Sequence, residues 1–136
     1  MKKEDCIFCK IASGEIPSKT LYEDELFRVI LDLNPATRGH ALILPKDHAS
    51  NLYDLPEETA AAVLVLAKKL AAAMVGKLGC DGLNLVQNNG EAAGQTVSHF
   101  HLHMIPRYVN DGQTLGWTPG KVTQEELEEV RKTLTE

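Results

Sequence analysis

The chain has 136 residues and a formal net charge of −5, with 43% hydrophobic and 24% charged residues. This length suits one domain with a single core, and the composition is ordinary for a soluble globular protein. No basic cluster suits a nucleic-acid polymer, and no apolar stretch of about 18 residues suits a membrane span. We therefore expect neither nucleic acid nor a membrane as a partner.

The cysteines and the N-terminus indicate the compartment. Cysteines stand at positions 6, 9 and 80, and an odd number with one close pair is not typical of a disulfide framework. Residues Met1–Asp5 place acidic side chains directly after the lysines, and no apolar run follows, so this is not a signal peptide. We predict the reducing cytoplasm as the location.

Hydrophobic periodicity and turn residues predict the elements in chain order. They are a short helix over 9–12, strands over 20–23, 26–31 and 40–45, a long helix over 56–78, strands over 83–88 and 95–107, and a C-terminal helix over about 123–134. Five strands in hairpin connections with one long helix indicate an α+β fold built on an antiparallel sheet. We expect 1–136 to be a single domain, with a core over about 4–107 and a C-terminal extension over about 108–136.

The two longer helices carry recognisable end signals. Pro56 in the first turn with Glu57 and Glu58 suits a helix N-terminus, and Gly79 suits the residue after the last turn. The C-terminal helix begins at a capping box, Thr123–Glu126. Spacings of three and four predict a buried face on the long helix: Val63, Leu66, Leu70, Met74 and Leu78.

The most informative segment is the histidine-rich strand predicted over 95–107. His99, His101 and His103 alternate with apolar residues, so the histidines should lie on one face of a strand and the apolar residues on the other. At about 3.3 Å per residue, the outer two Cα atoms would be about 13 Å apart, too far for all three to bind one metal ion easily. Three interpretations of these histidines remain open: a polar strand face, a row of metal ligands and a nucleophile site.

The loop before this strand offers groups that bind anions. Residues 90–96 contain two glycines together with Gln95 and Thr96, which supply backbone N–H groups, an amide and a hydroxyl to a phosphate. No Asp follows the second histidine, unlike the H-x-H-x-D-H type of metallohydrolase.

The segment over 94–105 resembles the signature of the histidine triad (HIT) family, in which three histidines alternate with apolar residues. The resemblance runs from about Cys6 to Lys46 and from Leu83 to Arg107, in the style of the nucleotide-binding Hint branch, and it thins after Arg107. It implies the HIT-like fold, a five-stranded antiparallel sheet with one long helix and short N-terminal and C-terminal helices. It also implies a homodimer in which two subunits form one larger sheet.

Cys6 and Cys9 form a C-x2-C pair, which alone suits two buried cysteines, a redox pair or half of a zinc site. A redox pair belongs between a strand and a helix, and no strand precedes this one. HIT proteins with this pair complete a zinc site with two further histidines, and His48 and His99 match their positions. The resemblance thus implies one structural zinc per chain, with His99 separated from the two reacting histidines.

The resemblance also implies a purine nucleotide site. Asp32 matches the acidic residue that binds the ribose hydroxyls, and Asn88 matches a residue on the phosphate side, near Gln95 and Thr96. The residues that match the apolar walls of the base pocket are Ile7, Phe8, Ile11, Ile30 and Leu33. Without the resemblance, Asp32 and Asn88 suit turns and the apolar residues suit a plain core.

The implied chemistry is transfer at the α-phosphorus of a nucleotide. His101, the central histidine, would attack as a neutral imidazole and form a nucleotidyl-histidine that water then hydrolyses. His103 would hold phosphate oxygens, and His40 would orient the site, although His40 also suits a surface position at a strand end. No catalytic metal is required.

The leading hypothesis is a Hint-type hydrolase of adenosine phosphoramidate-like P–N bonds. The alternatives are a dinucleoside polyphosphate hydrolase, a purine nucleotide-binding regulatory module with residual hydrolysis, and a metal-binding protein that uses the histidine row as ligands. The sequence does not distinguish adenine from guanine, because apolar walls stack on either base.

Overall fold

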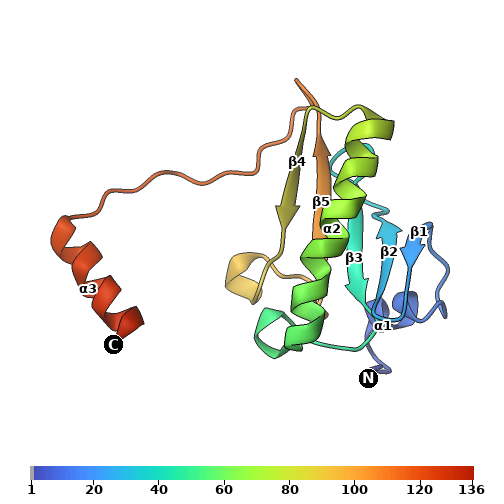
Figure 1. Ribbon diagram of the computed structural model, residues 1–136, viewed down its shortest axis with the longest axis horizontal. Helices are drawn as coiled ribbons and strands as arrows, with labels where there is room; N and C mark the ends of the chain where they lie inside the picture. The colour runs from blue at the N-terminus through green and yellow to red at the C-terminus, as the bar shows by residue number, and fades with distance from the viewer. Residues whose placement is uncertain (1) are drawn as a thin grey trace.

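The computed structural model describes residues 2–136 and contains one five-stranded antiparallel sheet in the order β1-β2-β3-β5-β4 (Figure 1). The strands are β1 (Thr20–Glu23), β2 (Phe27–Leu31), β3 (Ala41–Pro45), β4 (Gly82–Val86) and β5 (Leu102–Arg107). The helices are α1 (Ile7–Ala12), α2 (Glu57–Leu78) and α3 (Gln124–Thr135), with 3-10 turns at Leu52–Asp54 and Glu91–Ala93. The predicted α+β class and its antiparallel sheet are confirmed.

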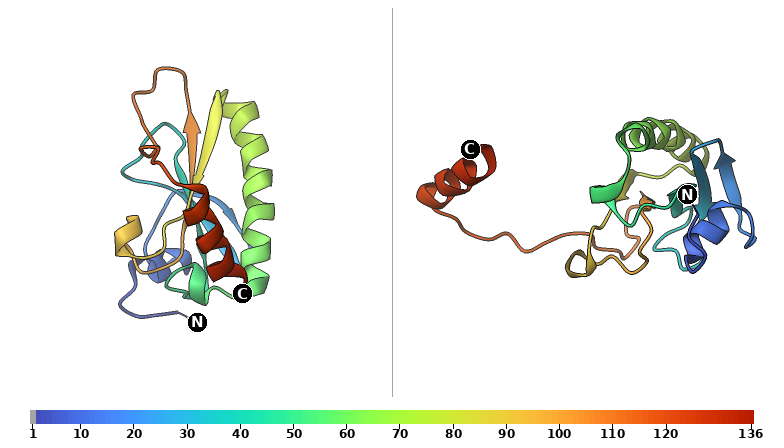
Figure 2. Two further views of the ribbon diagram at one scale, coloured as in Figure 1. Left: turned by 90° about the vertical axis from the view of Figure 1, so that its left-hand side faces the viewer. Right: turned by 90° about the horizontal axis from the view of Figure 1, so that it is seen from below.

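Helix α2 covers one face of the sheet (Figure 2, left). The buried sheet residues on that face are Phe27, Val29, Ala41, Ile43, Leu102 and Met104. From α2, Val63, Leu66 and Met74 are buried among them as predicted, and Leu70 and Leu78 are partly buried. Gly79 ends α2 in the left-handed conformation with φ 65°, which a glycine adopts without the steric cost of a Cβ.

The opposite face of the sheet carries α1 and the functional side chains. Ile30, Leu42 and Leu44 are buried there, with Ala12 and partly buried side chains from α1. Leu42 pairs with His103 across β3 and β5, and directly opposite residues in a ladder share a face. The register therefore places the last histidine of the row on the α1 face, away from the main core.

The predicted strand over 95–107 is too long, because β5 begins only at Leu102. The chain bends over Val97–His99, and the Phe100 N–H donates to the carbonyl of Ala49, 2.7 Å away in a loop. The predicted alternation nevertheless holds, because Phe100 and Leu102 are buried in the core beneath α2. An extended backbone alternates its side chains whether or not a neighbouring strand pairs with it.

Helix α2 also corrects the expectation that no segment could span a membrane. By length and composition alone it is long and apolar enough to do so, with a mean hydropathy of 1.6 over its most apolar window. One such helix is weak evidence, because a core helix passes the same test. Helix α2 packs on the sheet through one face, so we assign it to the core.

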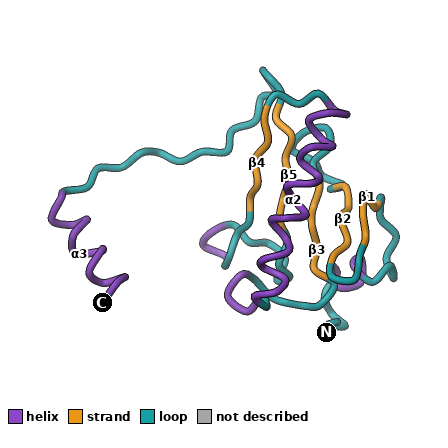
Figure 3. Tube along the Cα trace, viewed as in Figure 1, coloured by secondary structure: helices purple, strands orange, loops and turns teal. Residues whose placement is uncertain are grey.

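The C-terminal extension leaves the domain at the β4 side of the sheet and ends in α3 (Figures 1 and 3). As predicted, Thr123 caps α3, its hydroxyl accepting the Glu126 N–H at 3.1 Å. Every residue from Gly112 onward is exposed, including the apolar side chains Leu127, Val130 and Leu134.

Candidate active site

A cavity of about 660 Å³ opens on the α1 face of the sheet, a size typical of small-molecule sites. The sequence-predicted residues that line it are Ile7, Phe8, Ile11, Ile30, Asp32, Leu33, Thr96, His101 and His103. Ile30 forms the buried floor, whereas Leu33 is 87% exposed at the rim. The structure thus brings the predicted base, ribose and phosphate residues to one cavity, with Asn88, Gln95 and His40 outside its lining.

His101 has its reactive nitrogen fixed by the backbone. Its Nδ1 lies 2.7 Å from the carbonyl oxygen of His99. Since a carbonyl only accepts, Nδ1 carries the proton and Nε2 keeps its lone pair. The Phe8 ring packs edge-on against the imidazole, 4.9 Å between centroids. Burial lowers the pKa of His101 below its ordinary value, so the ring is neutral and nucleophilic at pH 7.

His40 and His103 form a hydrogen-bonded pair with a defined direction. The Ala36 N–H donates to His40 Nδ1 at 2.9 Å, so neutral His40 carries its proton on Nε2. That atom lies 3.0 Å from His103 Nδ1, which must accept. His103 therefore carries its own proton on Nε2, a donor suited to a phosphate oxygen. Burial, with the neighbouring His101 and His40, lowers the pKa of His103 to about 4.

Asp32 both makes a turn contact and lines the cavity. Its Oδ1 accepts the Asn34 N–H at 2.8 Å, which is the turn-forming contact. Its Oδ2 lies 3.5 Å from His40 Nε2, and the residue lines the cavity. The turn thus fixes the carboxylate while leaving one oxygen on the site.

A separate group of side chains could hold a metal ion: Cys6, Cys9, His48 and His99. The Sγ of Cys6 lies 3.2 Å from His99 Nδ1, and the Sγ of Cys9 lies 3.4 Å from Nδ1 of both histidines. Tetrahedral zinc would separate sulfur and nitrogen ligands by about 3.5 Å. His99 Nε2 donates to the Pro45 carbonyl at 2.9 Å, which leaves Nδ1 with its lone pair. The donor set and its geometry fit zinc.

The family profile of the HIT domain matches this chain over residues 13–110. This chain belongs to the histidine triad family. Adenosine 5'-monophosphoramidase hnt1 of Schizosaccharomyces pombe is 41% identical over 123 residues, covering 90% of each chain.

Two solved structures are similar over most of their length. A HIT family protein from Bacillus anthracis superposes with a TM-score of 0.89 at 42% identity, covering 96% of this chain and 95% of that one. A zinc-bound histidine triad family protein from Mycobacterium smegmatis gives 0.77 at 41% identity, covering 96% and 93%.

The loop residues of this HIT protein are used differently from one another. Gln95 donates its amide hydrogens to the carbonyls of Ser50 and Val97, at 2.6 and 2.9 Å, and its oxygen accepts the Gly90 N–H at 2.8 Å. These bonds occupy the whole amide, so we revise its predicted role from holding phosphate to shaping the loop. Thr96 lines the cavity and stays a candidate for phosphate contact.

Asp32, His40 and His103 form a second group of atoms close enough for a metal ion. The tautomers argue against one. His40 Nδ1 is taken by the Ala36 N–H, so Nε2 could bind a cation only by losing the last ring proton. We therefore assign this group to hydrogen bonding.

Sequence reasoning missed part of the cavity wall. The unpredicted lining residues are Ile16, Pro17, Ser18, Lys19, Leu31, Asn34, Leu42 and Val97. Leu42 lies in the predicted strand over 40–45, but its pairing with His103, which puts both on one face, is seen only in the structure. The turn over 16–19 carried no local signal either, because a hydrogen bond from Ile16 N–H to the Lys10 carbonyl folds it back toward α1.

Proposed function

We propose that this HIT protein is a nucleotide hydrolase that acts at the α-phosphorus of purine nucleotide derivatives, adenosine phosphoramidates first among them. The observation that carries the proposal is the bond from His101 Nδ1 to the His99 carbonyl, which leaves the Nε2 lone pair on a residue of the cavity wall. The Schizosaccharomyces pombe relative is an adenosine 5'-monophosphoramidase, which supports the choice of substrate.

In the first step, His101 Nε2 attacks the α-phosphorus and a new P–N bond forms. The bond from phosphorus to the amine of the substrate breaks, and the amine leaves with a proton taken from water. The imidazole gains positive charge as it reacts, and the His99 carbonyl 2.7 Å from Nδ1 stabilises that charge.

In the second step, water attacks the phosphorus of the nucleotidyl-histidine and returns neutral His101. His103 donates from Nε2 to a phosphate oxygen in both steps, because His40 occupies its Nδ1. Thr96 and Asn88 would add donors beside it. Fixed donors of this kind need no reorganisation during the reaction, which is the main source of rate acceleration in such sites.

The remainder of the cavity binds the nucleoside. Ile7, Phe8, Ile11, Ile30 and Leu33 would sandwich the purine. The free oxygen of Asp32 would accept a ribose hydroxyl. Apolar walls bind either purine, so adenine preference rests on the relative alone.

We assign one structural zinc per chain to Cys6, Cys9, His48 and His99. The zinc-bound relative from Mycobacterium smegmatis supports this. The metal would neutralise two thiolates and fix α1 against the loop that carries His99. Cys80, which lies outside the proposed zinc site, forms no disulfide, and this supports our proposal of a cytoplasmic location.

We infer a homodimer from an exposed apolar surface. Leu64 and Val65 of α2 are 60% and 57% exposed, and Leu85 on the edge strand β4 lies in the same groove. An uncovered apolar patch beside an unpaired strand is a surface that a second copy could extend. Leu64→Glu should give a monomer in analytical ultracentrifugation where the native chain gives a dimer.

The test of function is intact-mass spectrometry after rapid quenching without acid, using an adenosine phosphoramidate. The native protein should show a transient adenylate adduct, and His101→Ala should not. Parallel assays with a dinucleoside polyphosphate separate the two hydrolase candidates by kcat/KM. Nucleotide binding with neither adduct nor turnover would replace the proposal with a binding module.

A further inference from the structure

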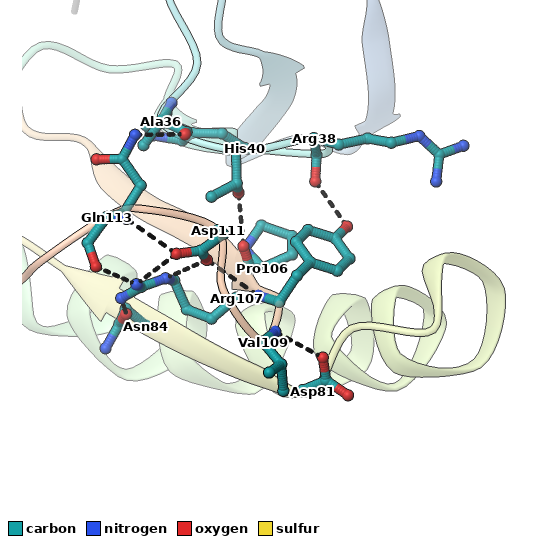
Figure 4. Close-up of polar contacts among 12 residues, drawn as sticks. Ala36, Arg38, His40, Asp81, Asn84, Pro106, Arg107, Val109, Asp111 and Gln113 are labelled. Atoms are coloured by element: carbon teal, nitrogen blue, oxygen red, sulfur yellow. Dashed lines mark hydrogen bonds and ion pairs between the residues drawn. The ribbon is translucent and has the colours of Figure 1, made fainter.

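A hydrogen-bond network beyond the cavity joins the end of β5 to the β2–β3 loop (Figure 4). We name residues 107–113 the latch. Arg107 Nε and Nη2 donate to the two carboxylate oxygens of Asp111 at 2.8 and 2.9 Å. Asp111 also accepts the N–H groups of Tyr108 and Gln113, each at 3.0 Å. These four donors satisfy the carboxylate and fix the latch in one conformation.

The latch holds two carbonyls of the β2–β3 loop. Gln113 Nε2 donates to the Ala36 carbonyl at 2.9 Å, and the Tyr108 hydroxyl donates to the Arg38 carbonyl at 2.8 Å. Arg107 Nη2 in turn donates to the Gln113 carbonyl at 2.6 Å, which ties the side-chain contact to the central ion pair.

The same loop also contacts His40 in the candidate active site. Ala36 gives its carbonyl to the latch and its N–H to His40 Nδ1. Between these two contacts, the Thr37 hydroxyl donates to the Pro106 carbonyl at 2.5 Å. If the loop moved away, His40 Nδ1 would lose its donor and the ring could place its proton there. His40 Nε2 would then be an acceptor and could no longer donate to His103.

We propose that the latch sets the tautomer and orientation of the His40–His103 pair, with Asp111, Gln113 and Tyr108 as positioning residues. None of these three lines the cavity, and Asp111 and Gln113 lie beyond residues 13–110, which the HIT domain profile matches. The kinetic consequence rests on the proposed function, whereas the tautomer consequence does not.

Two variants break the latch with little change in size. Tyr108→Phe removes only the hydroxyl on the Arg38 carbonyl, and Gln113→Glu turns a donor toward the Ala36 carbonyl into an acceptor. Gln124→Glu makes the same change on exposed α3, and Glu128→Gln weakens an Arg–carboxylate pair there, so both serve as matched controls.

The first measurement is the ¹⁵N NMR spectrum of the histidine rings, with the His40 signals assigned by a His40→Gln variant. The native chain should have His40 protonated on Nε2. Gln113→Glu should shift part of the population to the Nδ1 tautomer, and the controls should leave it unchanged. An unchanged His40 tautomer in both latch variants would overturn the proposal.

The second measurement is steady-state hydrolysis of an adenosine phosphoramidate. We expect kcat to fall about 10-fold in Gln113→Glu with a much smaller change in KM, because a misplaced donor acts on the reacting phosphate. Tm should stay close to that of the native chain, since Gln113 is exposed. If the native chain has no turnover, the proposed function fails, and the NMR comparison still decides the latch.

Discussion

Two successive histidines of the row, His99 and His101, use one residue type for two kinds of chemistry. His99 turns its Nδ1 lone pair toward two thiols, because its Nε2 donates to the Pro45 carbonyl. His101 presents the other nitrogen, because its Nδ1 donates to the His99 carbonyl. The difference lies in which ring nitrogen the backbone occupies. A histidine motif therefore gains its chemical meaning only when the hydrogen-bond partner of each ring is known.

The largest expected effect comes from removing the reactive histidine alone. His101→Ala should lower kcat by about 10³-fold or more, because no other neutral imidazole has a free Nε2 lone pair on the cavity. Zinc content should remain that of the native chain, since His101 is not a ligand. Ser98→Ala, in the bend just before His101, is the control and should retain activity. Near-native turnover in His101→Ala would refute the assignment of the nucleophile.

Removing a ligand of the proposed zinc site should lower the zinc content, which His101→Ala leaves unchanged. Cys9→Ala should reduce bound zinc from one per chain to almost none and lower Tm by about 10 °C or more, because metal binding stabilises only the folded state. Cys80→Ala is the matched control, since it removes another buried thiol outside the cluster. Equal zinc contents in both variants, measured by mass spectrometry of the metal, would contradict the zinc site.

A smaller effect is expected on substrate binding, from a variant of Asp32 that leaves His101 and the zinc ligands in place. Asp32→Asn keeps an oxygen for the Asn34 N–H but loses the negative charge offered to the ribose. We expect KM to rise about 10-fold with a modest change in kcat, because a charged hydrogen bond is lost. A substrate without the 2′ and 3′ hydroxyls should bind both proteins equally. If the variant still weakens its binding, Asp32 acts through the turn instead.

The smallest effect concerns pH. Protonation of His101 removes its lone pair, so activity should fall on the acid side as pH drops through its pKa. Burial lowers that pKa below the ordinary value of about 6.5, so the acid limb of kcat/KM should lie below pH 6.5. The lowered pKa values of His40 and His103 act in the same direction. A midpoint at or above 6.5 would argue that the free enzyme exposes His101 more than the structure does.

The sequence predicted local strand limits better than contacts between distant segments. Strand β1 has the predicted limits, Thr20–Glu23, because local alternation and flanking turns define it. The predicted strand began several residues before β5 does. Alternation indicates an extended backbone but not its hydrogen-bond partner, which for Phe100 is a loop carbonyl. We revise the predicted role of Gln95 for a related reason, since its three partners come from positions 50, 90 and 97. Contacts between distant segments leave no local pattern to read.

Helix α1 carries both sites on one and a half turns. Cys6 and Cys9 face the metal cluster, while Ile7, Phe8 and Ile11 line the cavity. Inserting one residue would rotate everything after it by about 100°, so neither face could change register without disturbing the other. If the proposed zinc and nucleotide both bind, they would share one rigid element, and any coupling between their affinities would be equal in both directions. A nucleotide that tightened zinc binding would then have its own binding tightened by zinc by the same factor.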